Sequence, residues 1–552
     1  MTTHSLVFAT HMALSKLRFS QMDFDYIIVG GGSAGCVLAN RLSADPTVTV
    51  LLLEAGGPDT SRLIHYPAGY SKLVGPKVSW EFRTTPQKHV NNREMHYPQG
   101  MTLGGGSSIN AMVYIRGNKN DYDQWESLGN AGWGYAGCLP YFRKAESNQR
   151  FTAPYHGDDG PLAVSDQVSP LPLTDLFVKA AQQAGHPFNP DFNGAQQHGI
   201  GYYQVTQRNR RRGSSAVSYL RPVQSRPNLS VVTLARVLRL LISGGRVTGV
   251  EYTIGGSSDL KTARATREVI SSSGAIGSPR LLLHSGIGPA DELKAVGIEP
   301  MHDLPGVGKN LQDHLDVYAV ATLKKPMSYD GQDKLIPSIK HGLQYLLYRT
   351  GPVTSNVCEG GAFLATDGND DWPDNQMHFL PAYVVDHGRK KIAGHGMTLN
   401  TAYLRPEARG SVTVMSDNPI DRPLVDPNFL GVDEDLRRSI ACFKQSREIL
   451  AQPAFADLIE AEYMPGKGIR SDAEIADYVR EWSKTDYHPV GTCKMGDDDM
   501  AVVDTQLRVR GLEGLRVIDS SIMPTLVSGN TNAPSIMIGE KGAAIMLAGA
   551  VV

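Results

Sequence analysis

The chain has 552 residues, with 54 basic and 56 acidic side chains and a formal net charge of -2. This balance gives no electrostatic reason to expect a nucleic-acid partner. A chain of this length exceeds one ordinary hydrophobic core, so we expect two domains. The five cysteines are widely spaced and form no CxxC or zinc pattern, which fits a reducing compartment such as the cytoplasm.

The first segment, 1–23, carries a short apolar patch that His11 interrupts, and no convincing signal-peptide cleavage site follows it. We expect a flexible extension there. Elsewhere no apolar run approaches the ~20 residues of a membrane span. The apolar stretch that starts at Pro534 is broken by Glu540 and Lys541.

A short apolar strand and a glycine-rich turn open the first predicted domain. The strand, 25–30, leads into the turn at 30–35 and then into an apolar helical pattern. In this context Gly30 permits a tight turn and Gly32 lets the backbone approach a pyrophosphate. Gly35 lets the helix pack on the strand, with its first amides facing the anion. The order of strand, turn and helix predicts a dinucleotide site.

The second predicted strand, 48–53, ends at an acidic residue. Glu54 stands roughly twenty residues beyond the glycines, where a carboxylate accepts hydrogen bonds from ribose hydroxyls. A carboxylate at this position also disfavours a 2'-phosphate. The fingerprint alone leaves the choice between NAD and FAD open.

Further along the chain, residues 100–114 form a glycine-rich loop followed by a stretch apolar enough to be buried. Such a loop has several amides free to cradle a phosphate or the edge of a ring. Strand patterns at 229–233, 247–252 and 268–272 extend the cofactor domain. From about 311 to 480 the pattern changes. Runs beginning at Met377, Met397 and Gly410 predict sheet strands without any phosphate-loop chemistry.

Five ordered segments resemble the signature regions of the glucose-methanol-choline family of flavin oxidoreductases, especially its bacterial choline-dehydrogenase-like and aliphatic or polyether alcohol dehydrogenases. They span 100–114, 274–288, 306–314, 487–496 and 517–524. The resemblance runs from about Phe24 to the C-terminus. It implies FAD as the cofactor.

The resemblance also implies a fold. We expect an α/β architecture in which a Rossmann-like FAD-binding domain carries a second, α+β substrate domain built on an antiparallel sheet. The FAD-binding domain is discontinuous, because the family's catalytic pair lies late in the chain. We assign 24–165, 200–310 and 484–552 to the FAD-binding domain, and 166–199 and 311–483 to the substrate-binding domain.

The predicted FAD is held without a covalent bond. Family members that attach FAD covalently have a histidine where this chain has Ile109, which offers no nucleophile. Met101 replaces a basic residue that is common at the start of the same loop. The predicted cofactor-binding residues are Gly30, Gly32, Ser33, Ala34, Gly35, Glu54, Ala55, Leu103, Gly104, Gly105, Ser107, Asn110, Ala111, Met112, Val113, Val237, Asp519 and Asn530.

The family's catalytic base falls on His488, and its second catalytic position falls on Asn532. A flavin that oxidises an alcohol takes hydride from the carbinol carbon, and the barrier falls if a base removes the hydroxyl proton. Histidine, with an unperturbed pKa of about 6.5, presents a neutral accepting nitrogen at neutral pH. The Asn532 amide would donate to the alkoxide. The alternative is a satisfied core histidine and a turn asparagine.

The expected function is FAD-dependent oxidation of a primary alcohol, of aliphatic or polyether type, to the aldehyde. The electrons would pass to a quinone, a partner protein or another acceptor that is not oxygen. Choline dehydrogenase, an oxidase that uses dioxygen, and a hydroxynitrile lyase on the same fold are alternatives, and a catalytically inactive binding protein is disfavoured. Relatives that pass electrons to a respiratory chain often lie on the membrane, so peripheral contact with the inner membrane is compatible with the resemblance. Oligomeric state stays open.

Three other features carry weaker predictions. Glu359 either faces a cationic substrate or serves as an internal hydrogen-bond acceptor. The basic run at 208–212 is interpreted as a solvated loop. The remaining histidines considered lack metal-ligand spacing, so we predict no metal site. These are His314, His378, His387 and His395.

Overall fold

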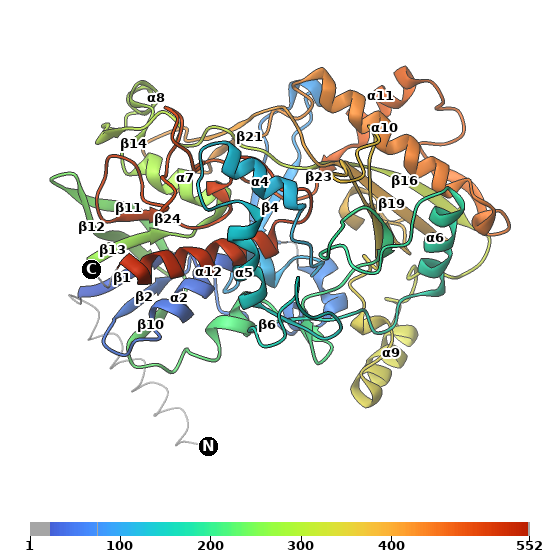
Figure 1. Cartoon of the computed structure of the whole chain (residues 1–552), viewed down its shortest axis with the longest axis horizontal. Coiled ribbons are helices and arrows are strands. Elements are labelled where there is room, and N and C mark those ends of the chain that lie inside the picture. The colour runs from blue at the N-terminus through green and yellow to red at the C-terminus, as the bar shows by residue number, and fades with distance from the viewer. Residues whose placement is uncertain (1–22, 74, 550–552) are drawn as a thin grey trace.

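The structure is a computed structural model that describes residues 23–73 and 75–549. The predicted extension at 1–23 therefore lies almost wholly outside the described residues. Two seven-stranded sheets occupy the two halves of the molecule (Figure 1). The first sheet is mixed and the second is antiparallel, which confirms the predicted α/β fold class with an antiparallel second domain.

The first sheet has a parallel centre and an antiparallel edge. Its order is β10-β2-β1-β13-β12-β11, and β24 also pairs with β13. The pairings among β10, β2, β1, β13 and β24 are parallel, whereas β12 and β11 join antiparallel. The strands are β1 Asp23–Val29, β2 Val50–Leu53, β10 Leu229–Val232, β11 Ala235–Ser243, β12 Arg246–Ile254, β13 Lys261–Ser271 and β24 Leu515–Val517.

The glycine turn brings the first strand and helix into direct contact. Helix α2, Ser33–Leu42, begins directly after the turn, as predicted. Gly30 has a φ of +102°, which favours glycine. A Cβ on Gly35 would lie 1.9 Å from the Gly30 carbonyl oxygen, so only glycine fits there. Helix α12, Asn532–Gly549, packs on α2, where a Cβ on Gly539 would lie 3.0 Å from Val37.

We expect Gly35→Ala to destabilise the protein and to lower its flavin content. The added methyl group cannot avoid the Gly30 carbonyl unless α2 moves away from β1. Thermal unfolding and the flavin absorbance of purified protein measure both effects. Gly468→Ala is the matched control, because a Cβ at Gly468 meets nothing within 4 Å. Equal unfolding temperatures for the two variants would contradict this account of Gly35.

The second sheet is antiparallel in every pairing. Its order is β22-β16-β19-β18-β17-β7, and β23 pairs with β16. Side chains such as Phe379 and Leu399 are fully buried against helices α6, Pro172–Gln183, and α10, Asp433–Leu450, and this gives the second half its own core. The strands are β7 Gly199–Tyr202, β16 Leu315–Leu323, β17 Gly360–Leu364, β18 Asn375–Leu380, β19 Gly396–Tyr403, β22 Ile459–Met464 and β23 Lys484–Thr485.

The remaining elements surround the two sheets. Ten short strands pair as five ribbons: β3 Ser79–Arg83 with β4 His96–Gly100, β5 Glu146–Asn148 with β6 Leu162–Val164, β8 Gln207–Arg208 with β9 Arg211–Arg212, β14 Ile287–Gly288 with β15 His302–Asp303, and β20 Ser411–Thr413 with β21 Leu424–Asp426. The other α-helices are α3 Arg62–His65, α4 Lys119–Ser127, α5 Tyr135–Ala145, α6 Pro172–Gln183, α7 Gly274–His284, α8 Ala290–Ala295, α9 Leu335–Tyr348, α10 Asp433–Leu450 and α11 Asp472–Trp482.

Three short strands refine the predicted organisation. Although the predicted domain limits lie at 199/200 and 483/484, β7 and β23 both pair within the second sheet. The strand predicted from Gly410 is β20, which joins a separate ribbon instead of the second sheet. The division of the chain into two domains otherwise stays a prediction.

Candidate active site

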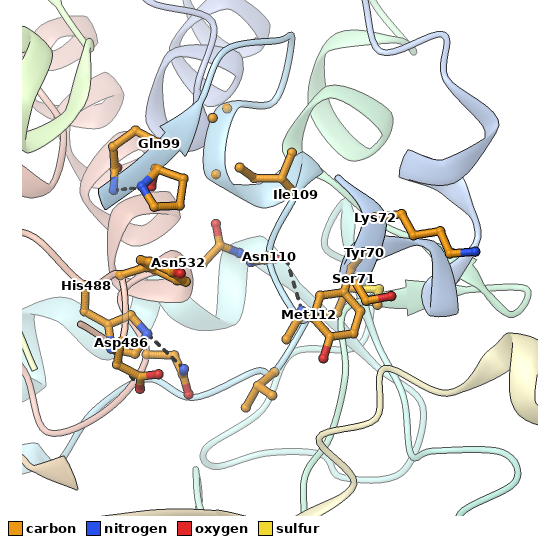
Figure 2. A pocket seen from close by; sticks show the side chains of 18 of the residues that line it. Tyr70, Ser71, Lys72, Gln99, Ile109, Asn110, Met112, Asp486, His488 and Asn532 are labelled. Atoms are coloured by element: carbon orange, nitrogen blue, oxygen red, sulfur yellow. Dashed lines mark hydrogen bonds and ion pairs between the residues drawn. The ribbon is translucent and has the colours of Figure 1, made fainter. Parts of the chain in front are cut away.

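One cavity of about 1390 Å³ runs between the two halves of the molecule. This volume exceeds the roughly 300–1,000 Å³ typical of sites for drug-sized ligands. Its walls include the glycine turn at Gly30, the loop around Asn110 and the segment around His488. Figure 2 shows His488 and Asp486 on one side of this space and Lys72 on the opposite side. The predicted cofactor and catalytic segments therefore share one chamber.

Most of the predicted cofactor residues line this cavity. They are Gly30, Gly32, Ser33, Ala34, Glu54, Ala55, Gly105, Asn110, Ala111, Met112, Val113, Val237, Asp519 and Asn530. Four others, Gly35, Leu103, Gly104 and Ser107, are not among its lining residues. Gly35 and Ser107 support the wall instead: Gly35 at the crossing of α2 and β1, and Ser107 through its hydroxyl, which accepts from the Ser215 amide at 2.9 Å.

The glycine turn is shaped for an anionic ligand. A Cβ on Gly32 would meet its first neighbour only at 3.9 Å, so the backbone there is open to the cavity. The Glu54 carboxylate is fixed by the amides of Gly31 at 2.8 Å and Gly56 at 2.7 Å. Burial raises the pKa of Glu54 to about 7. These residues fit a bound dinucleotide, since the turn leaves space for a pyrophosphate and Glu54 faces the same chamber.

A buried arginine supports the second loop. Arg212 is 1% exposed, and its guanidinium donates to the Ser107 carbonyl at 3.1 Å and to Asn110 Oδ1 at 2.7 Å. Burial lowers its pKa to about 9. The interpretation of 208–212 as a solvated loop fits exposed Arg208 and Arg211 but is wrong for Arg212. A basic side chain from elsewhere in the sequence thus supports the glycine-rich loop at 100–114.

Strand pairing brings two histidines together beside the cavity. His314 directly precedes β16, and His488 follows β23 by three residues. Because Leu315 pairs with Thr485, the ends of the two strands lie side by side, and the two Nδ1 atoms are 3.0 Å apart. The His488 amide also donates to Asp313 Oδ1 at 2.7 Å. Sequence reasoning assigned His314 no role, so this contact is new information.

The hydrogen bonds define the tautomer of each neutral ring. His314 Nε2 lies 3.0 Å from the Leu404 carbonyl, which can only accept, so His314 carries its proton on Nε2. Its Nδ1 is then an acceptor, and His488 must donate from Nδ1. This leaves a lone pair on His488 Nε2, the nitrogen that receives a hydrogen bond from Asn530 at 3.0 Å. A proton acceptor therefore faces the chamber.

Asn530, and not Asn532, contacts the histidine. Asn530 Nδ2 donates to His488 Nε2, and its Oδ1 accepts from Gln376 at 3.0 Å. Asn532 also lines the cavity, but its Oδ1 accepts from Ser33 Oγ at 2.8 Å. Ser33 is the first residue of α2, directly after the glycine turn, so this bond ties Asn532 to the cofactor side. The geometry favours exchanging the roles predicted for the two asparagines.

Burial and nearby charge set the protonation states of His314 and His488. Burial lowers the pKa of His488 to about 4 and that of His314 to about 3, so both rings are neutral at physiological pH. Asp486 Oδ2 lies 3.6 Å from His488 Nδ1 and 3.9 Å from His378 Nδ1. Burial raises the pKa of Asp486, but His488, His378 and Lys484 outweigh it, so the carboxylate stays ionised. This charge would stabilise an imidazolium at His488.

Glu359 is an internal acceptor in this structure. It is fully buried, and its two carboxylate oxygens receive hydrogen bonds from the Leu171 amide and the hydroxyls of Thr174, Tyr329 and Ser355 at 2.5–2.8 Å. It does not line the cavity. The arrangement supports the interpretation of Glu359 as an internal hydrogen-bond acceptor and not as a residue that faces a cationic substrate.

Comparison with known proteins identifies the family. The sequence profiles of glucose-methanol-choline (GMC) oxidoreductases match residues 24–316 and 406–539, which is most of the chain. The chain belongs to the GMC oxidoreductase family. The alcohol dehydrogenase (acceptor) of Pseudomonas putida is 49% identical to it over 95% of this chain and 96% of its own length. The mitochondrial choline dehydrogenase of Homo sapiens is 44% identical over 96% and 90%.

Solved structures agree with this assignment. An FAD-dependent oxidoreductase from Chaetomium thermophilum has a TM-score of 0.89 at 27% identity, covering 96% of this chain and 100% of that one. Across residues 23–73 and 75–549 of this GMC oxidoreductase, no cluster of metal-ligating side chains occurs. Within the same residues, no helix combines the length and the apolar character needed to cross a bilayer.

Proposed function

We propose that this GMC oxidoreductase binds FAD without a covalent bond and oxidises a primary alcohol to the aldehyde. The observation that carries the proposal is the lone pair on His488 Nε2, held in the chamber that the glycine turn also lines. Ile109 lines the same chamber and offers no atom for covalent attachment. Bound FAD would supply the hydride acceptor.

The protein's own residues move and hold the proton. The alcohol hydroxyl replaces the Asn530 amide as the donor to His488 Nε2, gives its proton to that atom and accepts a hydrogen bond from Asn530 Nδ2. The resulting imidazolium donates from Nδ1 to His314, with the Asp486 carboxylate nearby. Asn532 remains on the cofactor side through Ser33. The contacts of His488 with His314 and Asp486, and that of Asn530 with the alcohol oxygen, favour an alkoxide poised to lose hydride.

The preferred substrate is a neutral aliphatic or ether alcohol, and the electrons pass to a quinone or another non-oxygen acceptor. The 49% identity to an enzyme named alcohol dehydrogenase (acceptor) supports this choice. Choline is the second candidate, since enzymes named choline dehydrogenase are 44% identical. The burial of Glu359 away from the cavity argues against its use as a partner for the choline cation.

Anaerobic titration of the purified protein with 1-octanol, a polyethylene glycol and choline tests the proposal. Bleaching of the flavin absorbance by an alcohol supports it, and readmitted air then separates a dehydrogenase from an oxidase. Bleaching by choline alone would favour the second candidate. A flavin that stays oxidised with every compound would overturn the redox assignment and favour the lyase alternative.

We expect Glu359→Gln to lower thermal stability without changing substrate preference. The amide nitrogen of glutamine would face donors where the carboxylate accepts four hydrogen bonds. The ratio of kcat/KM for choline to that for 1-octanol should stay within about twofold of wild type, because Glu359 does not line the cavity and contacts neither substrate. A selective loss for choline of about tenfold or more would show that Glu359 recognises the cation.

A further inference from the structure

Helix α9 presents an apolar face to solvent. Figure 1 shows it standing out from the end of the molecule that carries the second sheet. Tyr345 anchors it: its ring contacts Tyr66 edge-on at 5.5 Å, and its hydroxyl donates to the Arg210 carbonyl at 3.1 Å. The large apolar side chains on the outer side are 55–80% exposed: Leu335, Ile336, Ile339, Leu343, Leu346, Leu347 and Tyr348.

An exposed apolar surface of this kind needs an occupant. Single exposed apolar side chains are common on protein surfaces, whereas a contiguous set marks an interaction site. The helix has 14 residues and is therefore about 21 Å long. Its apolar side chains recur along the whole length at helical spacing, as at Ile336, Ile339, Leu343 and Leu347. The shape is a ridge, which suits a soft, extended partner.

The border of this ridge is basic. Lys334 and Arg349 stand at the two ends of the helix, and exposed Lys340 lies on it. Exposed Arg211 stacks over the Tyr66 ring at 5.8 Å, next to the Tyr345 anchor. Asp333 is the acidic residue adjacent to the helix start. Arg211 belongs to the basic run at 208–212, which the sequence analysis interpreted as a solvated loop. Its side chain instead borders the apolar face of α9.

The same helix stands at an opening of the active-site cavity. Lys334, Ser338 and His341 line the cavity from this side. Lys334 and Ser338 are exposed, as are the lining residues Ser71 and Lys72, so the chamber reaches the surface here. Figure 2 shows Lys72 across the chamber from His488. Whatever covers α9 also lies beside this opening.

We propose that α9 and its basic border dock this face of the protein onto an anionic lipid bilayer. The apolar ridge enters the boundary between headgroups and acyl chains, and the lysine and arginine side chains contact lipid phosphates. A second copy of the chain fits less well, because the two basic borders would repel each other. The helix lies in the interface plane and does not span the bilayer.

Docking would bring the cavity opening to the lipid surface. A lipid-dissolved alcohol or electron acceptor could then enter without crossing bulk water. This consequence rests on the proposed function, whereas docking itself does not. A failure of vesicle binding would therefore leave the reaction untouched, and a failure of alcohol oxidation would leave the docking surface untouched.

Co-sedimentation of the purified holoprotein with vesicles tests the proposal. We expect binding to vesicles of phosphatidylcholine with phosphatidylglycerol, weaker binding to phosphatidylcholine alone, and a decrease with added salt. The double variant Ile336→Glu, Leu347→Glu should lose about tenfold or more of the binding. Leu260→Glu, Met301→Glu is the matched control, since both residues are similarly exposed but lie away from α9. Oxidation of a water-soluble alcohol with a soluble dye should be equal in all three proteins.

A site-specific probe gives an independent readout. All five native cysteines are buried, so Leu347→Cys can be labelled selectively with an environment-sensitive dye. Its emission should shift to the blue with anionic vesicles, and that of labelled Leu260→Cys should not. Absence of vesicle binding by the wild type would overturn the proposal. So would a dimer that the Glu variants dissociate while vesicle binding is unchanged, because α9 would then bind a second copy.

Discussion

His488→Ala should retain its flavin and reduce it with alcohol about 10²- to 10⁴-fold more slowly than wild type, the range for loss of a general base. The side chain supplies the lone pair on Nε2. Two hydrogen bonds keep it there: His488 Nδ1 donates to His314, and His314 donates to the Leu404 carbonyl. Stopped-flow reduction under anaerobic conditions measures the effect. Flavin absorbance and thermal unfolding establish that the variant is folded and loaded.

The pH dependence gives the same prediction a second test. Protonated His488 cannot accept a proton, so the reduction rate falls as pH falls through the pKa of the ring. Because burial lowers that pKa to about 4, the wild-type rate should stay level well below the ordinary histidine value of about 6.5. His89→Ala, at an exposed position outside the cavity, is the control. Reduction by His488→Ala at the wild-type rate would remove His488 from the mechanism.

The sequence predicted the nucleotide-binding half well because its signals are local. The β1 strand, the glycine turn and α2 follow one another within twenty residues, and Gly35 needs no distant partner to explain it. The apolar runs at Met377 and Met397 became β18 and β19 for the same reason. The run at Gly410 became the three-residue strand β20. It pairs with β21, in the next segment of the chain, and not with the second sheet.

The details of the active site depended on contacts that span the sequence. One residue separates Asn530 from Asn532, the first residue of α12, and only the folded turn decides which contacts His488 and which contacts Ser33. His314 is 174 residues from His488 and reaches it through the pairing of β16 with β23. A search restricted to metal-ligand spacing could not find it. Its place directly before an apolar strand was the available signal.

His314→Leu should lower the rate of flavin reduction by about 10- to 100-fold at saturating alcohol, the range found when a group that orients a metal-binding histidine is lost. Leucine fills a similar volume but cannot accept the proton that His488 donates from Nδ1. Without that acceptor the ring can turn or carry its proton on Nε2, where it no longer acts as a base. Alcohol binding should change little, since His314 is fully buried and does not line the cavity.

His314→Gln distinguishes positioning from packing. The glutamine amide can accept from His488 Nδ1 with its oxygen and donate to the Leu404 carbonyl with its nitrogen, as His314 does. We therefore expect the glutamine variant to recover much of the reduction rate that the leucine variant loses, at similar flavin content and unfolding temperature. If both variants are equally slow, or if the loss appears in KM and not in kcat, His314 does not set the tautomer of His488. Recovery by glutamine alone would show that a hydrogen-bond relay ending at a backbone carbonyl keeps the base ready to accept a proton.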